Sequence, residues 1–187
     1  MKRILHTLLV LATLAGTAQA RADEALWNLL RGGGQVVLVR HALTDPGVGD
    51  PPGMTLDDCA SQRNLSAEGR REAQRLGEAL RARGVPMAGL QSSPWCRCVE
   101  TARLAFGRVP ETNPALGNLF GRPELQAQQV AQLRPLASRV PAGGNLFLVT
   151  HGSTTMALTG VSPATAEMVV LSPQGERFVV AGRLPLP

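Results

Sequence analysis

Two kinds of hydrophobic pattern alternate along the chain. Continuous apolar runs at 36–39 and 145–149 are typical of strands that are buried on both faces of a parallel sheet. Between them, 67–83 carries apolar side chains at spacings of three and four, which predicts an amphipathic helix. Similar patterns predict further helices at 23–31, 94–106, 123–133 and 153–158, a short strand at 88–92, and a hairpin of 168–171 with 177–180. Strands that alternate with helices favour an α/β fold, a three-layer α/β/α sandwich with a mostly parallel central sheet.

Several residues mark where these helices begin and end. Ser66 is expected to be a helix N-cap, and Gly84 stands at the C′ position of the same helix. Ser93 is expected to cap the helix that Pro94 opens, whereas Pro135 is expected to kink or stop a later helix. The helix at 67–83 is expected to carry three ion pairs at i,i+3 spacing on its solvent-facing side. They are Glu68–Arg71, Glu72–Arg75 and Glu78–Arg81.

The beginning of the chain has the order of a secretory signal peptide. Two cationic residues precede a mostly apolar stretch at 4–15, and 18–20 is Ala-Gln-Ala, the small residues of a cleavage site. The apolar stretch is shorter than the about 20 residues that a membrane-spanning helix needs, and no later segment is apolar enough either. We therefore expect a signal peptide at 1–20, one domain at 21–187, no membrane span, and a periplasmic or secreted protein.

The positive charge of the chain comes almost entirely from arginine. The formal net charge is +5 over 187 residues, and Lys2 is the only lysine. No stretch combines clustered arginines with stacking aromatic residues, so we expect no nucleic-acid partner. A mildly positive, arginine-rich chain suits an anionic substrate, because the guanidinium group matches the planar arrangement of phosphate oxygens.

Two histidines directly follow the predicted buried strands. His41 comes after 36–39 and Arg40, and His151 comes after 145–149. Ligands of open α/β sheets bind beyond the carboxyl ends of the strands, so both imidazoles are expected at one ligand-binding edge. A single histidine in such a place is more often a core or surface residue, but two histidines with an adjacent arginine favour a functional site.

A third candidate lies at the start of a predicted helix. Arg97 follows Ser92-Ser93-Pro94 and falls in the first helical turn, where free backbone amides favour anions. Its guanidinium adds a two-pronged donor for phosphate oxygens. The alternative is a solvated surface arginine, which is common in an arginine-rich chain. Together with Arg40 and both histidines, Arg97 predicts an anion pocket.

Four motifs in this order resemble the histidine phosphatase, or phosphoglycerate mutase-like, superfamily. They are Val39-Arg40-His41 with Thr44, Leu65-Ser66-Ala67-Glu68-Gly69, Ser92-Ser93-Pro94 with Arg97 and Glu100-Thr101-Ala102, and Val149-Thr150-His151-Gly152. The resemblance covers nearly all of 21–187. It implies a small exported member of the family, which is a metal-independent phosphatase that needs no cofactor.

The resemblance also implies a role for each site residue. His41 takes the phosphoryl group from the substrate and forms a phosphohistidine intermediate, which water then hydrolyses. Arg40 and Arg97 hold the phosphoryl oxygens, and His151 donates hydrogen bonds to the same oxygens. The further residues expected to bind substrate are Thr44, Asn118, Gly152 and Ser153.

Two positions depart from the family pattern. Ala42 replaces the glycine of Arg-His-Gly, which is a small change unless that residue needs a positive φ. Asn118 stands near the position where related members carry a glutamate that protonates the leaving group, and an amide cannot do so. Glu111, Glu124 and Asp45 are candidate substitutes for this general acid, and none of them is favoured over the others.

The three cysteines do not have the spacing of a zinc site. On a helical wheel Cys98 joins the apolar face of its predicted helix, whereas Cys96 lies off that face. In an oxidising compartment we favour a Cys59–Cys96 disulfide, which would pin the loop at 43–64 beside the pocket. A Cys59–Cys98 disulfide is the alternative.

The leading hypothesis is an exported phosphatase that acts on a small phosphorylated substrate. Similarity to small exported family members suggests a sugar phosphate of the cell envelope. The alternative is a non-catalytic phosphate-binding module, which Asn118 favours and an intact His41 disfavours. A metal site at His41 and His151 is disfavoured, because no carboxylate or thiol is placed to complete the shell and the arginines repel cations.

Overall fold

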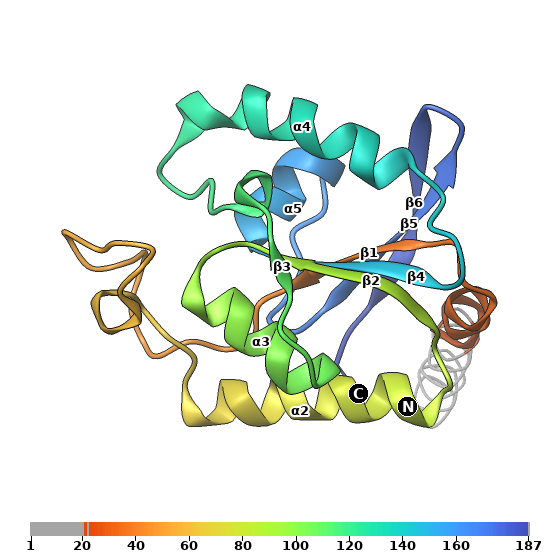
Figure 1. Ribbon diagram of the computed structural model, residues 1–187, viewed down its shortest axis with the longest axis horizontal. Helices are drawn as coiled ribbons and strands as arrows, with labels where there is room; N and C mark the ends of the chain where they lie inside the picture. The colour runs from red at the N-terminus through yellow and green to blue at the C-terminus, as the bar shows by residue number, and fades with distance from the viewer. Residues whose placement is uncertain (1–20, 22, 187) are drawn as a thin grey trace, which may run out of the picture.

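A six-stranded sheet forms the centre of the molecule in this computed structural model, which describes residue 21 and residues 23–186 (Figure 1). Its strands are β1 (Val36–Arg40), β2 (Met87–Ser92), β3 (Glu111–Thr112), β4 (Asn145–Thr150), β5 (Met168–Gln174) and β6 (Arg177–Leu184), in the spatial order β3-β2-β4-β1-β5-β6. The pairs among β3, β2, β4 and β1 are parallel, and β5 is antiparallel to both of its neighbours. The predicted mostly parallel sheet is confirmed, whereas the predicted signal peptide at 1–20 lies outside the described residues.

Helices cover both faces of this sheet. Helices α2 (Ala67–Ala82) and α3 (Cys96–Phe106) lie on one face, and α4 (Gln126–Ser138) and α5 (Gly152–Thr159) lie on the other (Figure 1). The connections contain the short 3-10 helices η1 (Cys59–Ser61), η2 (Pro114–Leu116) and η3 (Pro123–Leu125). Val37 and Val39 join the core cluster beneath α2 and α3, whereas Val36 and Leu38 join the cluster beneath α4 and α5. Burial on both faces therefore explains the continuous apolar pattern of β1.

Helix α2 begins and ends where its sequence predicts. The Ser66 hydroxyl accepts a hydrogen bond from the Gly69 amide, which confirms Ser66 as the N-cap. Gly84 has a φ of 62°, the left-handed conformation expected of a C′ glycine. The middle of α2 packs closely on α3, because a side chain at Gly77 would place its Cβ 2.0 Å from the Ala105 carbonyl oxygen. Glycine is therefore required where the two helices meet.

The exposed pairs on α2 differ in part from the expected ones. Glu68 binds Arg71 as predicted, but it also binds Arg75, which was expected to pair with Glu72. Glu72 turns toward the strand end instead and accepts a hydrogen bond from the Leu43 amide at 2.7 Å. The Leu43 amide needs a hydrogen-bond partner, whereas an exposed ion pair with Arg75 would contribute little to stability. The carboxylate of Glu72 therefore binds the amide.

The start of α3 also differs from its prediction. The helix begins at Cys96 with Trp95 at its N-cap, so Ser93 does not cap it. The Ser93 hydroxyl lies 2.8 Å from His151 Nε2 instead. This partner is far away in sequence, and a local capping rule cannot anticipate it.

Helix α4 continues past Pro135, which was expected to kink or stop it, so the predicted stop is wrong. The segment that Pro123 opens first forms η3 and then α4, which contains Pro135 in its interior. Leu133 and Ala137 are both buried in the cluster beneath α4 and α5. Their burial offsets the backbone hydrogen bond that the proline removes. No helix in the described part of the chain is long and apolar enough to cross a membrane.

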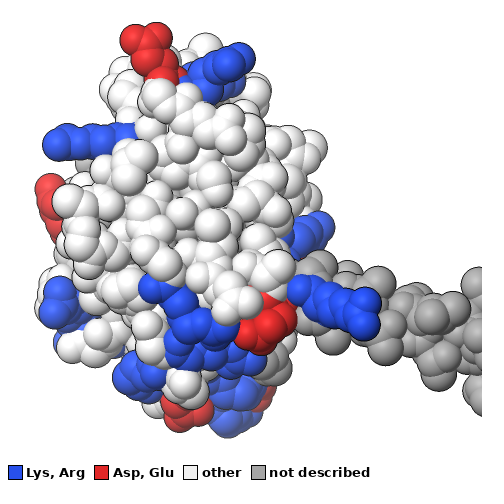
Figure 2. Space-filling view, turned by 90° about the vertical axis from the view of Figure 1, so that its right-hand side faces the viewer, with Lys and Arg blue, Asp and Glu red and all other residues white. Residues whose placement is uncertain are grey.

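The two ends of the sheet differ in character. Figure 2 shows the side that lies on the right of Figure 1, where β1 begins. Charged side chains gather there at the level of α2, and a region without charged side chains lies above them. At the opposite end, the carboxyl ends of the parallel strands face the long loop at 43–64 (Figure 1). That end carries both candidate histidines.

Candidate active site

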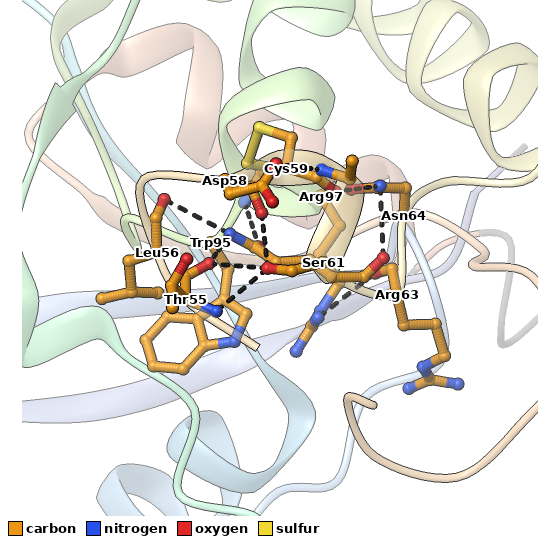
Figure 3. Close-up of a disulfide and its surroundings, with 12 residues drawn as sticks. Thr55, Leu56, Asp58, Cys59, Ser61, Arg63, Asn64, Trp95 and Arg97 are labelled. Carbon is orange, nitrogen blue, oxygen red and sulfur yellow. Dashed lines mark hydrogen bonds between the residues drawn. A yellow bond between two sulfur atoms is a disulfide. The ribbon is translucent and has the colours of Figure 1, made fainter. Parts of the chain in front are cut away.

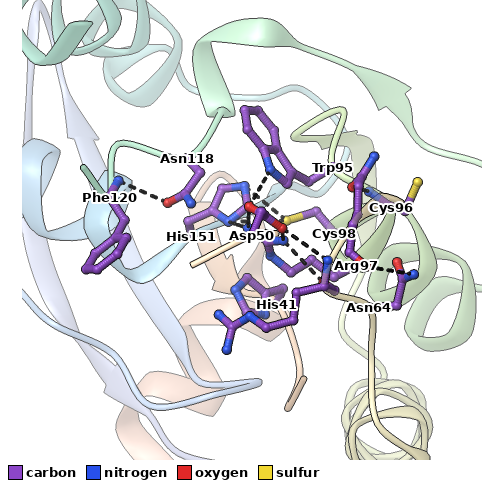
Figure 4. Close-up of polar contacts among 12 residues, drawn as sticks. His41, Asp50, Asn64, Trp95, Cys96, Arg97, Cys98, Asn118, Phe120 and His151 are labelled. Atoms are coloured by element: carbon purple, nitrogen blue, oxygen red, sulfur yellow. Dashed lines mark hydrogen bonds and ion pairs between the residues drawn. The ribbon is translucent and has the colours of Figure 1, made fainter. Parts of the chain in front are cut away.

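The two histidines meet because their strands are neighbours. Strands β1 and β4 are parallel, with Arg40 opposite Thr150, so the residues that follow them leave the sheet side by side. The His41 amide donates to the Thr150 carbonyl at 2.9 Å, and the centroids of the His41 and His151 rings are 5.3 Å apart. Figure 4 shows both rings and Arg97 turned toward one another. The predicted convergence at the sheet edge is therefore present.

A cavity of about 430 Å³ opens over these rings. Basic groups and histidines line its floor, namely Arg40, His41, Arg63, Arg97 and His151. The other lining residues are Gly47, Val48, Gly49, Asn118, Phe120, Gly152, Ser153, Met156 and Ser162. No aspartate or glutamate of the described residues lines the cavity, so the charged side chains that face it are basic.

His41 is a neutral ring with one free nitrogen. Its Nδ1 lies 2.8 Å from the Ala42 carbonyl oxygen. A carbonyl can only accept, so Nδ1 carries the hydrogen and Nε2 keeps its lone pair. Burial, together with the positive charges of nearby arginines, lowers the pKa of His41 to about 3. At neutral pH this imidazole is therefore uncharged and has an unshared electron pair.

His151 is held from behind by a hydroxyl. The Ser93 hydroxyl lies 2.8 Å from His151 Nε2, and Arg97 Nη2 lies 3.5 Å from His151 Nδ1. Burial lowers the pKa of His151 well below its usual value, and the nearby His41 and Arg97 lower it further. A guanidinium can only donate, so in the contact with Arg97 the His151 Nδ1 accepts and Nε2–H donates to the Ser93 hydroxyl. In the other tautomer the serine hydroxyl donates to Nε2, and Nδ1–H is then available to an anion in the cavity instead of accepting from Arg97.

Three arginines that line the cavity have N–H donors without a hydrogen-bond partner among the described residues. The Nε atoms of Arg40, Arg63 and Arg97 are buried and have no hydrogen-bond partner in the described structure. Arg40 Nη1 is held by the Pro163 carbonyl at 2.8 Å, and Gly152 leaves room beside this guanidinium, where a Cβ would come within 3.3 Å of Nε. Buried donors are rarely left unpaired in proteins. All three arginines line the same cavity, and their guanidinium groups make it suited to an oxyanion.

Asp50 is a site residue that the sequence analysis missed. Its carboxylate accepts from Arg97 Nη1 and Nη2 at 2.5 and 3.1 Å, and from Trp95 Nε1 at 3.1 Å (Figure 4). Burial raises the pKa of Asp50, but the hydrogen bonds and charge of Arg97 outweigh it, so the pKa lies below its usual value. The carboxylate therefore stays ionised and holds the outer edge of the Arg97 guanidinium.

Arg63 is the second residue that was missed. It lies immediately before Asn64-Leu65, and Leu65 forms a bridge with Thr44, which closes the long loop against the end of β1. This closure places Arg63 at the cavity, where its burial and the charge of Arg97 lower its pKa. Its position just before the Leu-Ser motif was the available signal, but a loop residue in an arginine-rich chain does not stand out.

Several predicted residues lie elsewhere or act differently. Thr44 is not among the residues that line the cavity, because it takes part in the bridge to Leu65. The acid candidates Asp45, Glu111 and Glu124 are all exposed, and none of them lines the cavity. Asn118 and Ser153 do line it, but Ser153 Oγ donates to Asn118 Oδ1 at 2.9 Å. The two side chains are therefore bonded to each other as well as facing the cavity.

A disulfide ties the long loop to the start of α3 (Figure 3). Cys59 and Cys96 are bonded, with their Cα atoms 5.7 Å apart, and Gln62 Oε1 accepts from the Cys96 amide at 2.9 Å. Cys98 is free and buried, and burial raises the pKa of its thiol to about 12. The structure thus contains the favoured pairing rather than Cys59–Cys98, and it fixes the loop one residue before Arg97.

The described residues offer no metal centre. They contain no group of three or more His, Cys, Asp and Glu side chains that could hold an ion. The nearest carboxylate, Asp50, is occupied by Arg97 and Trp95. The arrangement is therefore suited to an anion that is held by arginines and faces a neutral imidazole.

These features agree with comparison to known proteins. The family model of the histidine phosphatase superfamily, branch 1, matches residues 36–137, and the chain belongs to this superfamily. As a member it is a phosphatase. No curated protein sequence matches the chain.

Solved structures of distant proteins share the fold. The protein histidine phosphatase SixA in complex with tungstate is 16% identical, with a TM-score of 0.56 over 80% of this chain and 96% of that one. A mycobacterial glucosyl-3-phosphoglycerate phosphatase in complex with VO3 is 20% identical, with a TM-score of 0.59 over 78% and 96%. The product of an open reading frame of Mycobacterium tuberculosis is 17% identical, with a TM-score of 0.58 over 79% and 98%.

Proposed function

We propose that this protein is an exported phosphatase that hydrolyses a phosphomonoester through a phosphohistidine at His41, without a metal ion. The observation that carries the proposal is the hydrogen bond between His41 Nδ1 and the Ala42 carbonyl. It leaves Nε2 unprotonated in a neutral ring, at the floor of a cavity whose buried arginine donors have no partner. A nucleophile and an anion site therefore occupy the same cavity.

The substrate phosphoryl group would bind among the three arginines. Arg40, Arg63 and Arg97 all line the cavity, and their guanidinium N–H groups would donate to the phosphoryl oxygens. His151 Nδ1–H would donate to the same group when the Ser93 hydroxyl donates to Nε2. Fixed donors of this kind stabilise the charge that is spread over the phosphoryl oxygens in the transition state, and they need not reorganise during the reaction.

The reaction would proceed in two displacements at phosphorus. In the first, the lone pair of His41 Nε2 forms an N–P bond while the P–O bond to the leaving group breaks, and the leaving oxygen takes a proton from water. The Ala42 carbonyl continues to accept from Nδ1–H, which favours the positive charge that develops on the ring. In the second, water attacks phosphorus, the N–P bond breaks with return of its electron pair to Nε2, and the proton of water passes to solvent.

The test compares the hydrolysis of p-nitrophenyl phosphate by the wild type and by His41→Ala. We expect turnover to fall by about 10⁴-fold or more in the variant, because the nucleophile is lost. Vanadate binding should persist, since the arginines remain. In the wild type, an alkaline quench should retain protein-bound phosphate that acid then releases, as expected of a phosphorus–nitrogen bond. Substantial turnover by His41→Ala would overturn the proposed intermediate.

A second candidate is a non-catalytic phosphate-binding module. The absence of aspartate and glutamate from the described lining of the cavity favours it, because no side chain there can protonate a poor leaving group. The same experiment separates the two functions. Vanadate binding without turnover in the wild type would support the binding module.

Two observations support export to an oxidising compartment. Residues 1–20 have the sequence pattern of a signal peptide, and Cys59 is joined to Cys96. Disulfides persist mainly in such compartments. The N-terminal sequence of the protein recovered from a periplasmic or culture-medium fraction tests this proposal, and recovery of the uncleaved chain in the cytosol would contradict it.

A further inference from the structure

The outer half of the cavity has a different chemistry from its floor. Val48, Phe120 and Met156 line it and are 86%, 58% and 50% exposed. A second hollow of about 530 Å³ adjoins it and shares Phe120, Ser153 and Met156. The remaining residues of that hollow are Leu119, Gly121, Pro123, Gln126 and Ala157, so none of its side chains is charged. A molecule that is anchored by its phosphoryl group therefore emerges beside exposed apolar side chains and over a second hollow that carries no charge.

Phe120 is held in place over this surface by polar contacts of its own turn. Its backbone amide donates to Asn118 Oδ1 at 3.1 Å, and the same oxygen accepts from Ser153 Oγ at 2.9 Å. The Leu119 amide donates to Ser153 Oγ at 3.2 Å, which fastens the turn to the start of α5. Asn118, which replaces the acid of related members, thus positions an aromatic ring at the mouth of the cavity. Figure 4 shows Asn118 beside His151, with Phe120 beyond it.

The long loop closes the other side of this mouth. A Cβ built at Gly49 would lie 3.7 Å from Phe120 Cε1, which is ordinary van der Waals contact. The loop is held by the disulfide at Cys59 and by the Asp50–Arg97 ion pair. The phenyl ring therefore lies next to the loop, and both border the cavity that holds the arginines.

The lack of a general acid in the cavity restricts which leaving groups can depart from the phosphoryl group. No aspartate or glutamate of the described chain lines either hollow, and the neighbouring Asp50 is ionised on Arg97. An aliphatic alkoxide needs a proton as it departs, whereas a phenol, with a pKa of about 10, can leave as its anion and take a proton from water afterwards. The exposed Phe120 and Met156 side chains and a site without an acid independently favour the same kind of leaving group.

We propose that the hollow beside Phe120 and Met156 is a subsite for an aromatic leaving group, and that the substrates are aryl phosphate monoesters. This inference rests on the proposed function for its catalytic step, but the subsite itself concerns binding. The ring of the substrate would pack against Phe120 and Met156 while its phosphoryl group is held by the arginines. The P–O bond breaks with both electrons going to the phenolate oxygen.

Binding of phosphonates, which cannot be hydrolysed, tests the subsite without turnover. We expect phenylphosphonate to bind the wild type at least about 10-fold more tightly than methylphosphonate, because its ring is removed from water. Phe120→Ala should reduce this ratio to about threefold or less and leave inorganic phosphate binding unchanged. Val109→Ala is the matched control, since Val109 is a 73% exposed apolar residue outside both hollows. Equal affinity of the wild type for the two phosphonates would overturn the proposal.

Turnover then tests the substrate class. Phenyl phosphate should be hydrolysed at least about 100-fold faster than cyclohexyl phosphate in kcat/KM, and Met156→Glu should reduce the first value selectively, because it places a charge against the ring. A higher kcat/KM for glucose 1-phosphate than for phenyl phosphate would overturn the aryl substrate class. Selective phenylphosphonate binding by a protein that hydrolyses no ester would refute the proposed phosphatase reaction but uphold the subsite.

Discussion

The floor and the mouth of the cavity are built in different ways. Regular elements hold four of the five floor residues, and only Arg63 comes from the loop at 43–64. Arg40 ends β1, His41 and His151 directly follow β1 and β4, and Arg97 lies in the first turn of α3. The mouth consists of two irregular segments, the loop at 43–64 and the turn around Phe120. The floor is polar and buried, whereas Val48 and Phe120 are largely exposed. On the proposed function, the regular part would supply the chemistry common to phosphate esters, and the irregular part would determine which ester is accepted.

Asp50 belongs to the mouth by position but acts on the floor. It comes from the long loop, yet its carboxylate binds the outer edge of the Arg97 guanidinium. The disulfide between Cys59 and Cys96 joins the same two parts covalently. The comparison therefore predicts two classes of variant. Changes to the floor should affect every substrate equally, and changes to the mouth should affect selectivity.

The largest expected effect is that of Arg97→Ala. This change removes a donor that is fixed on the phosphoryl group, so kcat/KM should fall by about 10³-fold for phenyl and cyclohexyl phosphate alike. Arg97→Lys should recover only part of this loss, because it keeps the charge but lacks the planar fork. Arg134→Ala, at an exposed position of α4, is the control and should behave as wild type. A loss confined to one substrate would contradict the division between floor and mouth.

The next effect concerns the neutral histidine of the floor. Unfolded histidines take up a proton near pH 6.5, whereas folded His41 has a pKa of about 3. The unfolded chain therefore binds more protons in this window, so the free energy of unfolding falls as the pH drops from about 6.5 toward 3. Between pH 7 and pH 5, wild type should lose about 2 kcal/mol more than His41→Ala, which lacks the group.

Urea unfolding of both proteins at the two pH values measures this difference. The comparison with His41→Ala cancels the contributions of carboxylates that both proteins share. Equal losses in wild type and variant would show that His41 titrates normally in the folded state. In that case the neutral nucleophile of the floor would have to be reconsidered.

The site residues that could be predicted from the sequence belong to the floor, and those that could not belong to the loop and turn of the mouth. Arg40, His41 and His151 were predicted because a residue that follows a buried apolar run must lie at the carboxyl end of a strand. Asp50 and Phe120 could not be predicted, since no periodicity relates an irregular loop to the sheet edge. Even Asn118, which was placed at the cavity, turned out to bond with Ser153 and the Phe120 amide.

The errors in the fold have a similar cause. Ser93 was expected to cap α3, but its hydroxyl is bonded to His151, which lies on a strand end distant in sequence. Pro135 was expected to kink or stop α4, but the helix does not stop there, because burial of Leu133 and Ala137 maintains it. Elements that depend on local pattern, such as α2 with its Ser66 N-cap, were predicted well. Features decided by tertiary contacts were not.

A smaller effect is expected for Asp50→Asn, which tests the link between the two regions. The amide keeps the shape but loses the charge that holds Arg97, so kcat/KM should fall by about 10-fold with unchanged selectivity between aryl and alkyl esters. In an Arg97→Ala background the same change should have little further effect, since the partner is gone. Asp57→Asn, at an exposed position of the same loop, is the control. Tighter phosphate binding by Asp50→Asn would instead show that the carboxylate competes with substrate for Arg97.

The smallest effect is expected for Ala42→Gly, which restores the family's Arg-His-Gly motif within the floor. Ala42 is fully buried, and Ala166 is the only residue other than glycine with a positive φ among those described, so Ala42 has no need of glycine's freedom. Its carbonyl orients His41 and its amide is held by Thr101 Oγ1 at 3.1 Å, and neither contact involves the side chain.

For Ala42→Gly we expect kcat/KM within about twofold of wild type. The free energy of unfolding should fall by about 1 kcal/mol, because the buried methyl group is lost and the unfolded chain gains freedom. Ala60→Gly, at an exposed position, is the control for the backbone contribution alone. A tenfold change in kcat/KM would mean that the methyl group, rather than the Ala42 carbonyl, sets the position of the His41 ring.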